Sequence, residues 1–125
     1  MGEQMGDAVD PTAFEVGKHQ VDQAVVLTVC GEVDMLSSPK LAEAIQTALA
    51  AKPAALIVDL SKVDFLASAG MTVLVSAQAE VEPPTRFAVV ADGSATSRPI
   101  KLMGIDSVLS LYSSLDDALS SITDE

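Results

Sequence analysis

Short apolar runs alternate with amphipathic segments along most of the chain. Aliphatic and β-branched residues dominate residues 24–33, 54–60 and 86–90, and apolar runs of this length between turn residues are typical of buried strands. Apolar residues three and four positions apart follow the first two runs, which is the spacing of a helix packed on a sheet. The pattern predicts strands over 14–19, 24–33, 54–60, 86–90 and 107–111, and helices over 39–51, 69–80, 94–103 and 115–122.

Residues that begin and end helices support this assignment. Ser38 stands directly before Pro39, and a serine cap followed by proline at the first helical position is a common helix start. Ser114 is expected to cap the last helix, whose first turn holds two aspartates that the helix dipole favours. Gly104 is expected to stop the helix over 94–103, because glycine readily adopts the left-handed conformation that ends helices.

The order of these elements indicates the fold class. Strands that alternate with helices after residue 38 predict an α/β sandwich with largely parallel pairing, while the first two strands can pair antiparallel. A chain of 125 residues is long enough for one compact core and too short for two. We therefore expect one domain over residues 12–122, preceded by a flexible polar tail over residues 1–11.

Composition and charge exclude several classes of function. Aromatic residues make up only 3% of the chain, so the core is expected to be aliphatic. Eighteen acidic residues stand against seven basic ones, a net charge of -11, which repels nucleic acids and anionic membranes. No apolar run approaches the length needed to cross a membrane, and the first residues lack a signal peptide pattern. We expect a cytoplasmic protein with neither nucleic acid nor membrane as a partner.

Residues that carry enzymatic chemistry are scarce. Cys30 is the only cysteine and His19 the only histidine, so a thiolate cluster or a histidine-rich metal site cannot form. Cys30 is expected to be a buried thiol on an apolar strand, although a redox role through an intermolecular disulfide stays open. Phosphate-binding glycine loops and a serine hydrolase elbow are absent. We expect no cofactor, no metal and no catalytic activity.

Ser68 is the residue that attracts attention, within the stretch VDFLASAGM over residues 63–71. As a helix cap before Ala69, its hydroxyl would satisfy free backbone N–H groups. As a modification site, it would profit from small neighbours that let another protein's active site approach. Leu66 and Met71, if exposed, would then form an apolar contact surface beside it. A phosphate there would add about 1.5 to 2 negative charges.

Three segments together resemble the STAS-domain family, and within it the bacterial anti-sigma-factor antagonists. They are CGEVDMLSSPKLAEAI over residues 30–45, LIVDLSKVDFLASAGM over residues 56–71, and KLMGIDSVLSLYSSLDDAL over residues 101–119. The resemblance covers nearly all of the chain. It implies a small mixed sheet of about five strands with helices packed mainly on one face.

The resemblance also implies site residues. The family's phosphoacceptor serine corresponds to Ser68, and its G-E-L-D segment corresponds to residues 31–34. Ala67 and Ala69 replace an acidic residue and a serine of the family pattern, which puts the rate and the kinase of a phosphorylation at Ser68 in question. The residues expected to contact a partner are Gly31, Glu32, Asp34, Leu66, Ala67, Ala69, Gly70 and Met71.

The mechanism that the resemblance implies is partner switching. The unphosphorylated chain would bind an anti-sigma factor, often itself a Ser/Thr kinase, and so free a sigma factor. Phosphorylation of Ser68 would release the anti-sigma factor, and a phosphatase would reverse the change. An alternative keeps the fold but makes the chain a STAS subunit of a larger assembly, such as a lipid-transport ATPase complex or a stress-signalling scaffold, that binds partners without phosphorylation. The oligomeric state stays open.

Overall fold

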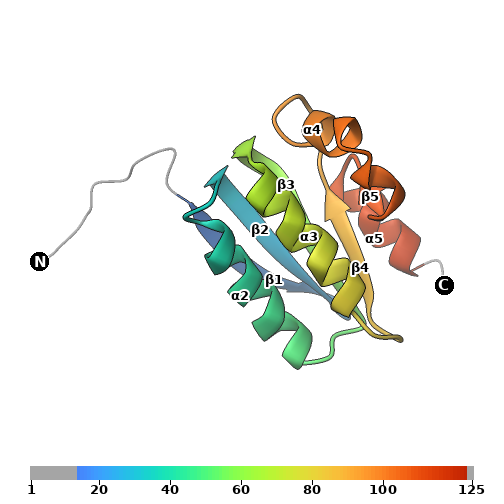
Figure 1. Cartoon of the computed structure of the whole chain (residues 1–125). Coiled ribbons are helices and arrows are strands. Elements are labelled where there is room, and N and C mark those ends of the chain that lie inside the picture. The colour runs from blue at the N-terminus through green and yellow to red at the C-terminus, as the bar shows by residue number, and fades with distance from the viewer. Residues whose placement is uncertain (1–13, 124–125) are drawn as a thin grey trace, which may run out of the picture.

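A five-stranded mixed sheet forms the centre of the molecule, seen in a computed structural model that describes residues 14–123 (Figure 1). The predicted tail over residues 1–11 lies outside the described residues. The elements are β1 (Glu15–Val21), β2 (Ala24–Val33), α2 (Ser38–Ala50), β3 (Ala55–Leu66), α3 (Ser68–Glu80), β4 (Arg86–Val90), α4 (Ser97–Leu102), the 3-10 turn η1 (Ile105–Ser107), β5 (Leu111–Tyr112) and α5 (Leu115–Thr123).

The strands lie in their chain order, β1-β2-β3-β4-β5. β1 and β2 form an antiparallel hairpin, while β2, β3, β4 and β5 run parallel to one another. The carboxyl ends of β2, β3 and β4 therefore meet at one edge of the sheet, from which the chain enters α2, α3 and α4. The predicted α/β fold with a mixed sheet is confirmed.

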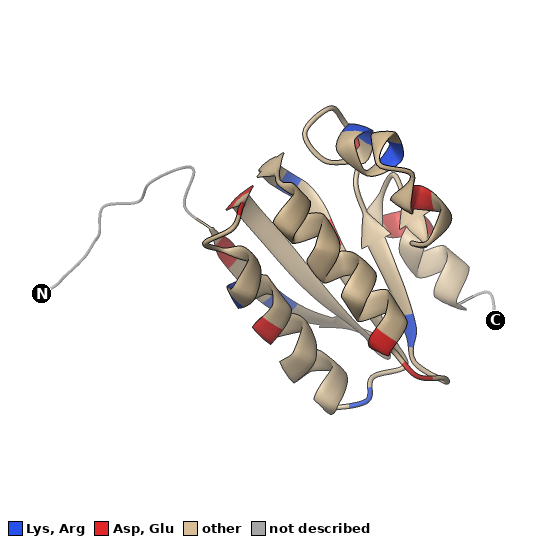
Figure 2. Ribbon diagram, in the orientation of Figure 1, with Lys and Arg blue, Asp and Glu red and all other residues tan. Residues whose placement is uncertain are grey.

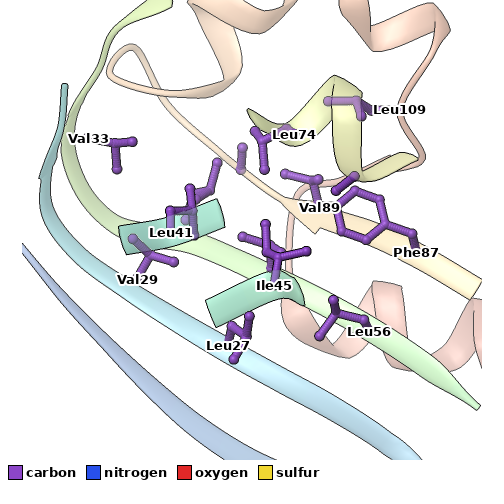
Figure 3. Close-up of a cluster of buried hydrophobic side chains, with 14 of the residues drawn as sticks. Leu27, Val29, Val33, Leu41, Ile45, Leu56, Leu74, Phe87, Val89 and Leu109 are labelled. Carbon is purple, nitrogen blue, oxygen red and sulfur yellow. The ribbon is translucent and has the colours of Figure 1, made fainter. Parts of the chain in front are cut away.

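The larger core lies between the sheet and helices α2 and α3, which cover the same face (Figure 1). Leu27 and Leu56 from the strands pack with Ile45 from α2 and Leu74 from α3 (Figure 3). Each of these side chains is at most 2% exposed. The aliphatic core expected from the composition is present, and Phe87 contributes a buried aromatic ring to it (Figure 3).

Helix α5 covers part of the opposite face, where a smaller apolar cluster joins it to the strands. Ala118 of α5 packs among Ala55, Ile57 and Val90. Ser114 caps α5 as predicted, since the Asp117 N–H donates to the Ser114 hydroxyl at 3.1 Å. Residues 55–60 of β3 are consequently buried without a break, as expected for a strand covered on both faces.

Several predicted boundaries were wrong. The first strand runs to Val21, and the hairpin turn is only two residues, with Asp22 at a φ of 55°. β3 continues to Leu66 instead of ending at residue 60. Polar residues appear after Leu60, but the pairing of β3 with β2 continues to the end of both strands. Residues 107–111, predicted as a strand, contain the end of η1, and β5 spans only Leu111–Tyr112.

Helix α4 is shorter than the predicted segment 94–103, because Pro99 is accommodated only within a first turn. Gly104 follows it at a φ of 76° and stops the helix as predicted. None of the helices in the described part of the chain is long and apolar enough to cross a membrane.

Candidate functional site

The ends of β2 and β3 lie side by side and bring the predicted site residues together. Val33 pairs with Leu66 at the last position of both strands. The Ala67 N–H then donates to the Val33 carbonyl oxygen at 2.8 Å, which extends the pairing by one residue. The chain turns into α3 directly afterwards, so Ser68 emerges beside the end of β2.

Ser68 is the first residue of α3 and is not its cap. Ala67 occupies the cap position with an extended backbone, φ -84° and ψ 167°. The Ala67 carbonyl oxygen accepts from the Gly70 N–H at 3.0 Å and from the Met71 N–H at 3.1 Å. The capping interpretation of Ser68 was therefore wrong, because the turn of the helix starts one residue earlier than the serine suggested.

The Ser68 hydroxyl is free for chemistry. The side chain is exposed, and its oxygen has no hydrogen-bond partner among the described residues. Only the backbone carbonyl of Ser68 is engaged, accepting from the Thr72 hydroxyl at 3.0 Å. The N–H groups of Ser68 and Ala69 open the first turn of a 13-residue helix and are directed toward incoming negative charge.

Gly70 explains how α3 comes so close to the strands. A Cβ on Gly70 would lie 2.5 Å from Val33 Cγ1 and 2.8 Å from Leu66 Cδ1, distances that no side chain can occupy. The absence of a side chain lets the first turn of α3 rest on the strand ends. This contact fixes where Ala67 and Ser68 stand relative to β2.

The loop between β2 and α2 is held by Asp34 and Ser37. One Asp34 carboxylate oxygen accepts from the N–H groups of Leu36 and Ser37, each at 3.0 Å. The Ser37 hydroxyl accepts from the Asp34 N–H at 2.9 Å and lies 2.9 Å from the Glu32 carbonyl oxygen. The hydrogen bond from the Ser37 N–H, supported by the Ser37 hydroxyl, lowers the pKa of Asp34 below its usual value.

This network also corrects the predicted start of α2. Ser38 was expected to be the cap, but it is the first residue of the helix, and its hydroxyl and N–H both donate to the Asp34 carbonyl oxygen. The Asp34 carboxylate takes the capping role for the turn that leads into the helix. Asp34 is therefore a loop-organising residue as well as a predicted partner contact.

Gly31 and Glu32 shape the end of β2. Gly31 has a φ of 89°, a conformation that favours glycine, and the register between β2 and β3 shifts between Gly31 and Glu32. Gly31 is buried and Glu32 is half-buried. This irregularity lies directly before Glu32, so that Glu32 and Asp34 stand at the edge of the sheet where α3 and Ser68 begin.

The apolar surface beside Ser68 is made by other residues than expected. Leu66 and Met71 are only 4% and 8% exposed, because both side chains point into the core. Phe65, at the alternate position of β3, is 51% exposed, and Met35 and Leu36 in the β2–α2 loop are 77% and 85% exposed. After Leu60 the burial of β3 does not alternate strictly, because Val63 and Leu66 are buried while Asp64 and Phe65 between them are exposed, so strand alternation did not identify Phe65.

The two solitary residues considered for redox or metal chemistry stand apart from this site. Cys30 is only half-buried, so the expectation of a buried thiol was wrong. It pairs with Glu15 across the β1–β2 hairpin, on the polar continuation of the face that α5 covers. His19 lies on the same hairpin. Among residues 14–123 no group of three His, Cys, Asp or Glu side chains is arranged to hold a metal ion.

Known proteins are similar to this chain over most of its length. A sequence model described as the STAS domain matches residues 15–118. The anti-sigma-F factor antagonist RsfB of Mycobacterium tuberculosis is 40% identical over 115 residues, which cover 92% of this chain and 93% of RsfB.

Solved structures agree in fold. An anti-sigma factor antagonist from Mycobacterium paratuberculosis superimposes with a TM-score of 0.87 at 40% identity, over 93% of this chain and 99% of the other. The Bacillus cell fate determinant SpoIIAA, in its phosphorylated form, gives a TM-score of 0.63 at 17% identity, over 88% and 99% of the two chains. The second similarity concerns the fold alone.

Proposed function

The chain belongs to the STAS domain family, and from this premise we propose that it is an anti-sigma-factor antagonist that works by partner switching. The unphosphorylated protein binds an anti-sigma factor and thereby frees a sigma factor for transcription. Identity of 40% to an anti-sigma-F factor antagonist over nearly the whole of both chains supports this role. The protein acts as a binding module in the cytoplasm and not as an enzyme.

One observation carries the proposal: Ser68 presents an exposed hydroxyl without a hydrogen-bond partner among the described residues. A serine at a helix start usually caps the helix, but here Ala67 holds that position. Phe65, Met35 and Leu36 expose apolar surface on the neighbouring strand end and loop. A modifiable group bordered by exposed apolar side chains is suited to a contact that phosphorylation can break.

The switch is a phosphoryl transfer to Ser68. The γ-phosphoryl group of ATP, supplied by a Ser/Thr kinase that can be the anti-sigma factor itself, forms a bond to Ser68 Oγ. The hydroxyl proton leaves and ADP is released. A phosphatase later transfers the phosphoryl group to water and restores the hydroxyl.

The phosphate would be tolerated within this protein and rejected at the interface. The free N–H groups of Ser68 and Ala69 at the start of α3 favour an anion. Across the interface the added charge must be desolvated, next to the carboxylates of Glu32 and Asp34 on the adjoining strand end. Partner release follows without unfolding.

Ala67 and Ala69 make Ser68 accessible to a kinase but give the kinase little to recognise. Both are half-buried and small, so they leave the Ser68 hydroxyl open to a kinase active site. They offer no charge for a kinase to recognise. We therefore expect the kinase to depend on surfaces beyond the immediate flanks of Ser68.

The test is the affinity for the anti-sigma-F factor of the source organism, measured by isothermal titration calorimetry. Ser68→Ala should bind as the unmodified protein does, whereas Ser68→Glu should bind at least about tenfold more weakly. Ser76→Glu is the matched control, because Ser76 is an exposed serine two turns further along α3. If Ser68→Glu binds as tightly as the unmodified protein, the partner switch is refuted and a phosphorylation-independent STAS subunit is favoured.

A second experiment addresses the covalent step. The anti-sigma factor and ATP are incubated with the protein, and the phosphate is located by mass spectrometry. A single phosphate on Ser68 that is missing from Ser68→Ala supports the mechanism. Phosphate elsewhere would contradict the assignment of Ser68.

A further inference from the structure

A second exposed apolar group lies at the same edge of the sheet as Ser68. Within the described part of the chain, the large apolar side chains that are mostly or half exposed fall into two groups. The first, Met35, Leu36 and Phe65, borders Ser68. The second consists of Leu102 (75% exposed), Met103 (62%) and Val108 (50%), in α4 and the segment after it. The proposed switch at Ser68 does not explain why the side chains of this second group are exposed.

Topology places the two groups at one end of the molecule. α4 follows the carboxyl end of β4, while the loop with Met35 and Leu36 follows the carboxyl end of β2. Because these strands are parallel members of one sheet, both segments rise from the same edge. Figure 1 shows α4 at the end of the sheet where α3 begins. A single folded protein can therefore contact both apolar groups.

The exposed side of α4 also carries positive charge. Arg98, Lys101 and Leu102 stand at helical spacings of three and four residues and therefore share one face. Ile100, on the other side, is fully buried in the main core. Figure 2 shows the basic residues of α4 together on this short helix. Neither Arg98 nor Lys101 has an ion-pair partner among residues 14–123.

We propose that the face formed by Arg98, Lys101, Leu102, Met103 and Val108, here called the α4 face, docks an acidic segment with apolar side chains on the anti-sigma factor. This inference rests on the function proposed above. Carboxylates of the partner pair with the two cations, and its apolar side chains cover the three exposed hydrophobic residues. Arg98 and Lys101 are neighbouring cations with no ion-pair partner in the described part of a chain whose net charge is -11, and this local positive charge is complementary to an acidic segment.

Other occupants fit the charges less well. An anionic membrane would attract the α4 face but would be repelled by the remainder of a strongly acidic protein. Two copies of the chain that met through this face about a twofold axis would bring two pairs of cations into one interface. An acidic protein segment meets neither difficulty, because it needs only to match the local charge.

The α4 face does not include Ser68, so it contributes to binding in both phosphorylation states. It therefore adds a constant contribution to the affinity, called the anchor here, while phosphorylation of Ser68 weakens the remaining contact enough for the partner to be released. Ser68→Glu should retain weak binding, and substitutions in the α4 face should remove that remainder.

The test measures binding to the purified anti-sigma-F factor by surface plasmon resonance at two salt concentrations. Leu102→Ser with Met103→Ser should weaken binding about tenfold, and both residues are exposed, so the fold should persist. Arg98→Glu with Lys101→Glu should slow association and reduce its dependence on salt. Lys18→Glu with Lys52→Glu makes the same change in net charge at exposed positions away from α4 and should bind as the unmodified protein does.

The outcomes separate the inference from the proposed function. If Ser68→Glu loses affinity while both α4 variants bind like the unmodified protein, the anchor is refuted and the switch survives. If the unmodified protein fails to bind the anti-sigma factor, both are refuted. Sedimentation with phosphatidylserine vesicles and sedimentation equilibrium complete the test. Vesicle binding or dimerisation that the α4 variants abolish would assign the face to lipid or to a second copy instead.

Discussion

Gly70 lies against Val33 so closely that a Cβ at position 70 would come within 2.5 Å of Val33 Cγ1. The contact joins the first turn of α3 to the end of β2 and so positions the site. Gly70→Ala should lower the free energy of unfolding by about 1 to 3 kcal/mol, the usual cost of overpacking. This loss would exceed the gain of up to about 1 kcal/mol that alanine brings to a helix.

Urea unfolding checks this prediction, with Gly17→Ala as the control. A Cβ on Gly17 would lie 3.6 Å from its nearest neighbour, His19 Nε2, an ordinary contact, so stability should hardly change. In a Val33→Ala background, Gly70→Ala should cost less, since Val33 Cγ1, the nearer of the two obstructing groups, is gone. Equal costs in both backgrounds would show that the close approach is not the cause.

Ser68 should be dispensable for folding. Its hydroxyl makes no hydrogen bond to the described residues and caps no helix. Ser68→Ala should therefore change the free energy of unfolding by less than about 0.5 kcal/mol, the range of ordinary surface substitutions. A loss near about 1 kcal/mol in a urea unfolding curve would restore the capping interpretation.

Ser37 should matter far more than Ser68, although both are serines at a helix start. Its hydroxyl accepts from the Asp34 N–H and lies within hydrogen-bond distance of the Glu32 carbonyl oxygen and the Asp34 carboxylate. Ser37→Ala should destabilise the protein by about 1 to 2 kcal/mol, because a part-buried N–H group loses its partner. Ser76→Ala, at an exposed helical position, provides the comparison in thermal unfolding. Equal melting temperatures for the two variants would contradict the role of Ser37.

The sequence predicted the architecture well because strands and helices follow from patterns that many residues share. Residues 24–33 and 86–90 became β2 and β4 with unchanged bounds, since burial on both faces leaves a continuous apolar run. The end of β3 was missed because Ser61, Lys62 and Asp64 are polar. They belong to a part of β3 that still pairs with β2 but is no longer buried on both faces.

The location of the site was predicted, but its helix cap and its exposed apolar residues were not. Ser68 looked like a cap because serine favours that position, yet Ala67 is the cap, and the first turn of α3 packs on β2 through Gly70 and Val33, a contact between distant segments. Leu66 and Phe65 exchanged roles for a similar reason. Which of two adjacent apolar residues faces the core depends on strand length and register, and a local pattern did not specify either.

The Asp34 carboxylate should make stability depend on pH. Its pKa lies below the usual 3.8 in the folded protein, because the N–H groups of Ser37 and Leu36 donate to the charged form. A carboxyl group with a lowered folded pKa stabilises the fold above its unfolded pKa, and this contribution disappears as the pH falls through the folded value. The stability difference between the unmodified protein and Asp34→Asn should therefore shrink below about pH 4. Urea unfolding between pH 3 and 7 measures it, and a difference independent of pH would contradict the assignment.

Ala67 offers a direct test of how α3 begins. Its extended backbone and its carbonyl bonds to Gly70 and Met71 mark it as the cap, yet its side chain has no acceptor. Ala67→Asp should add a carboxylate that accepts from the free N–H groups of the first turn and raise the free energy of unfolding by about 1 kcal/mol. Ala69→Asp brings the same charge to the helix start without the capping geometry and should gain less. If both variants raise the free energy of unfolding equally, only the added charge stabilises the helix start. Ala67 would then not be the capping position of α3.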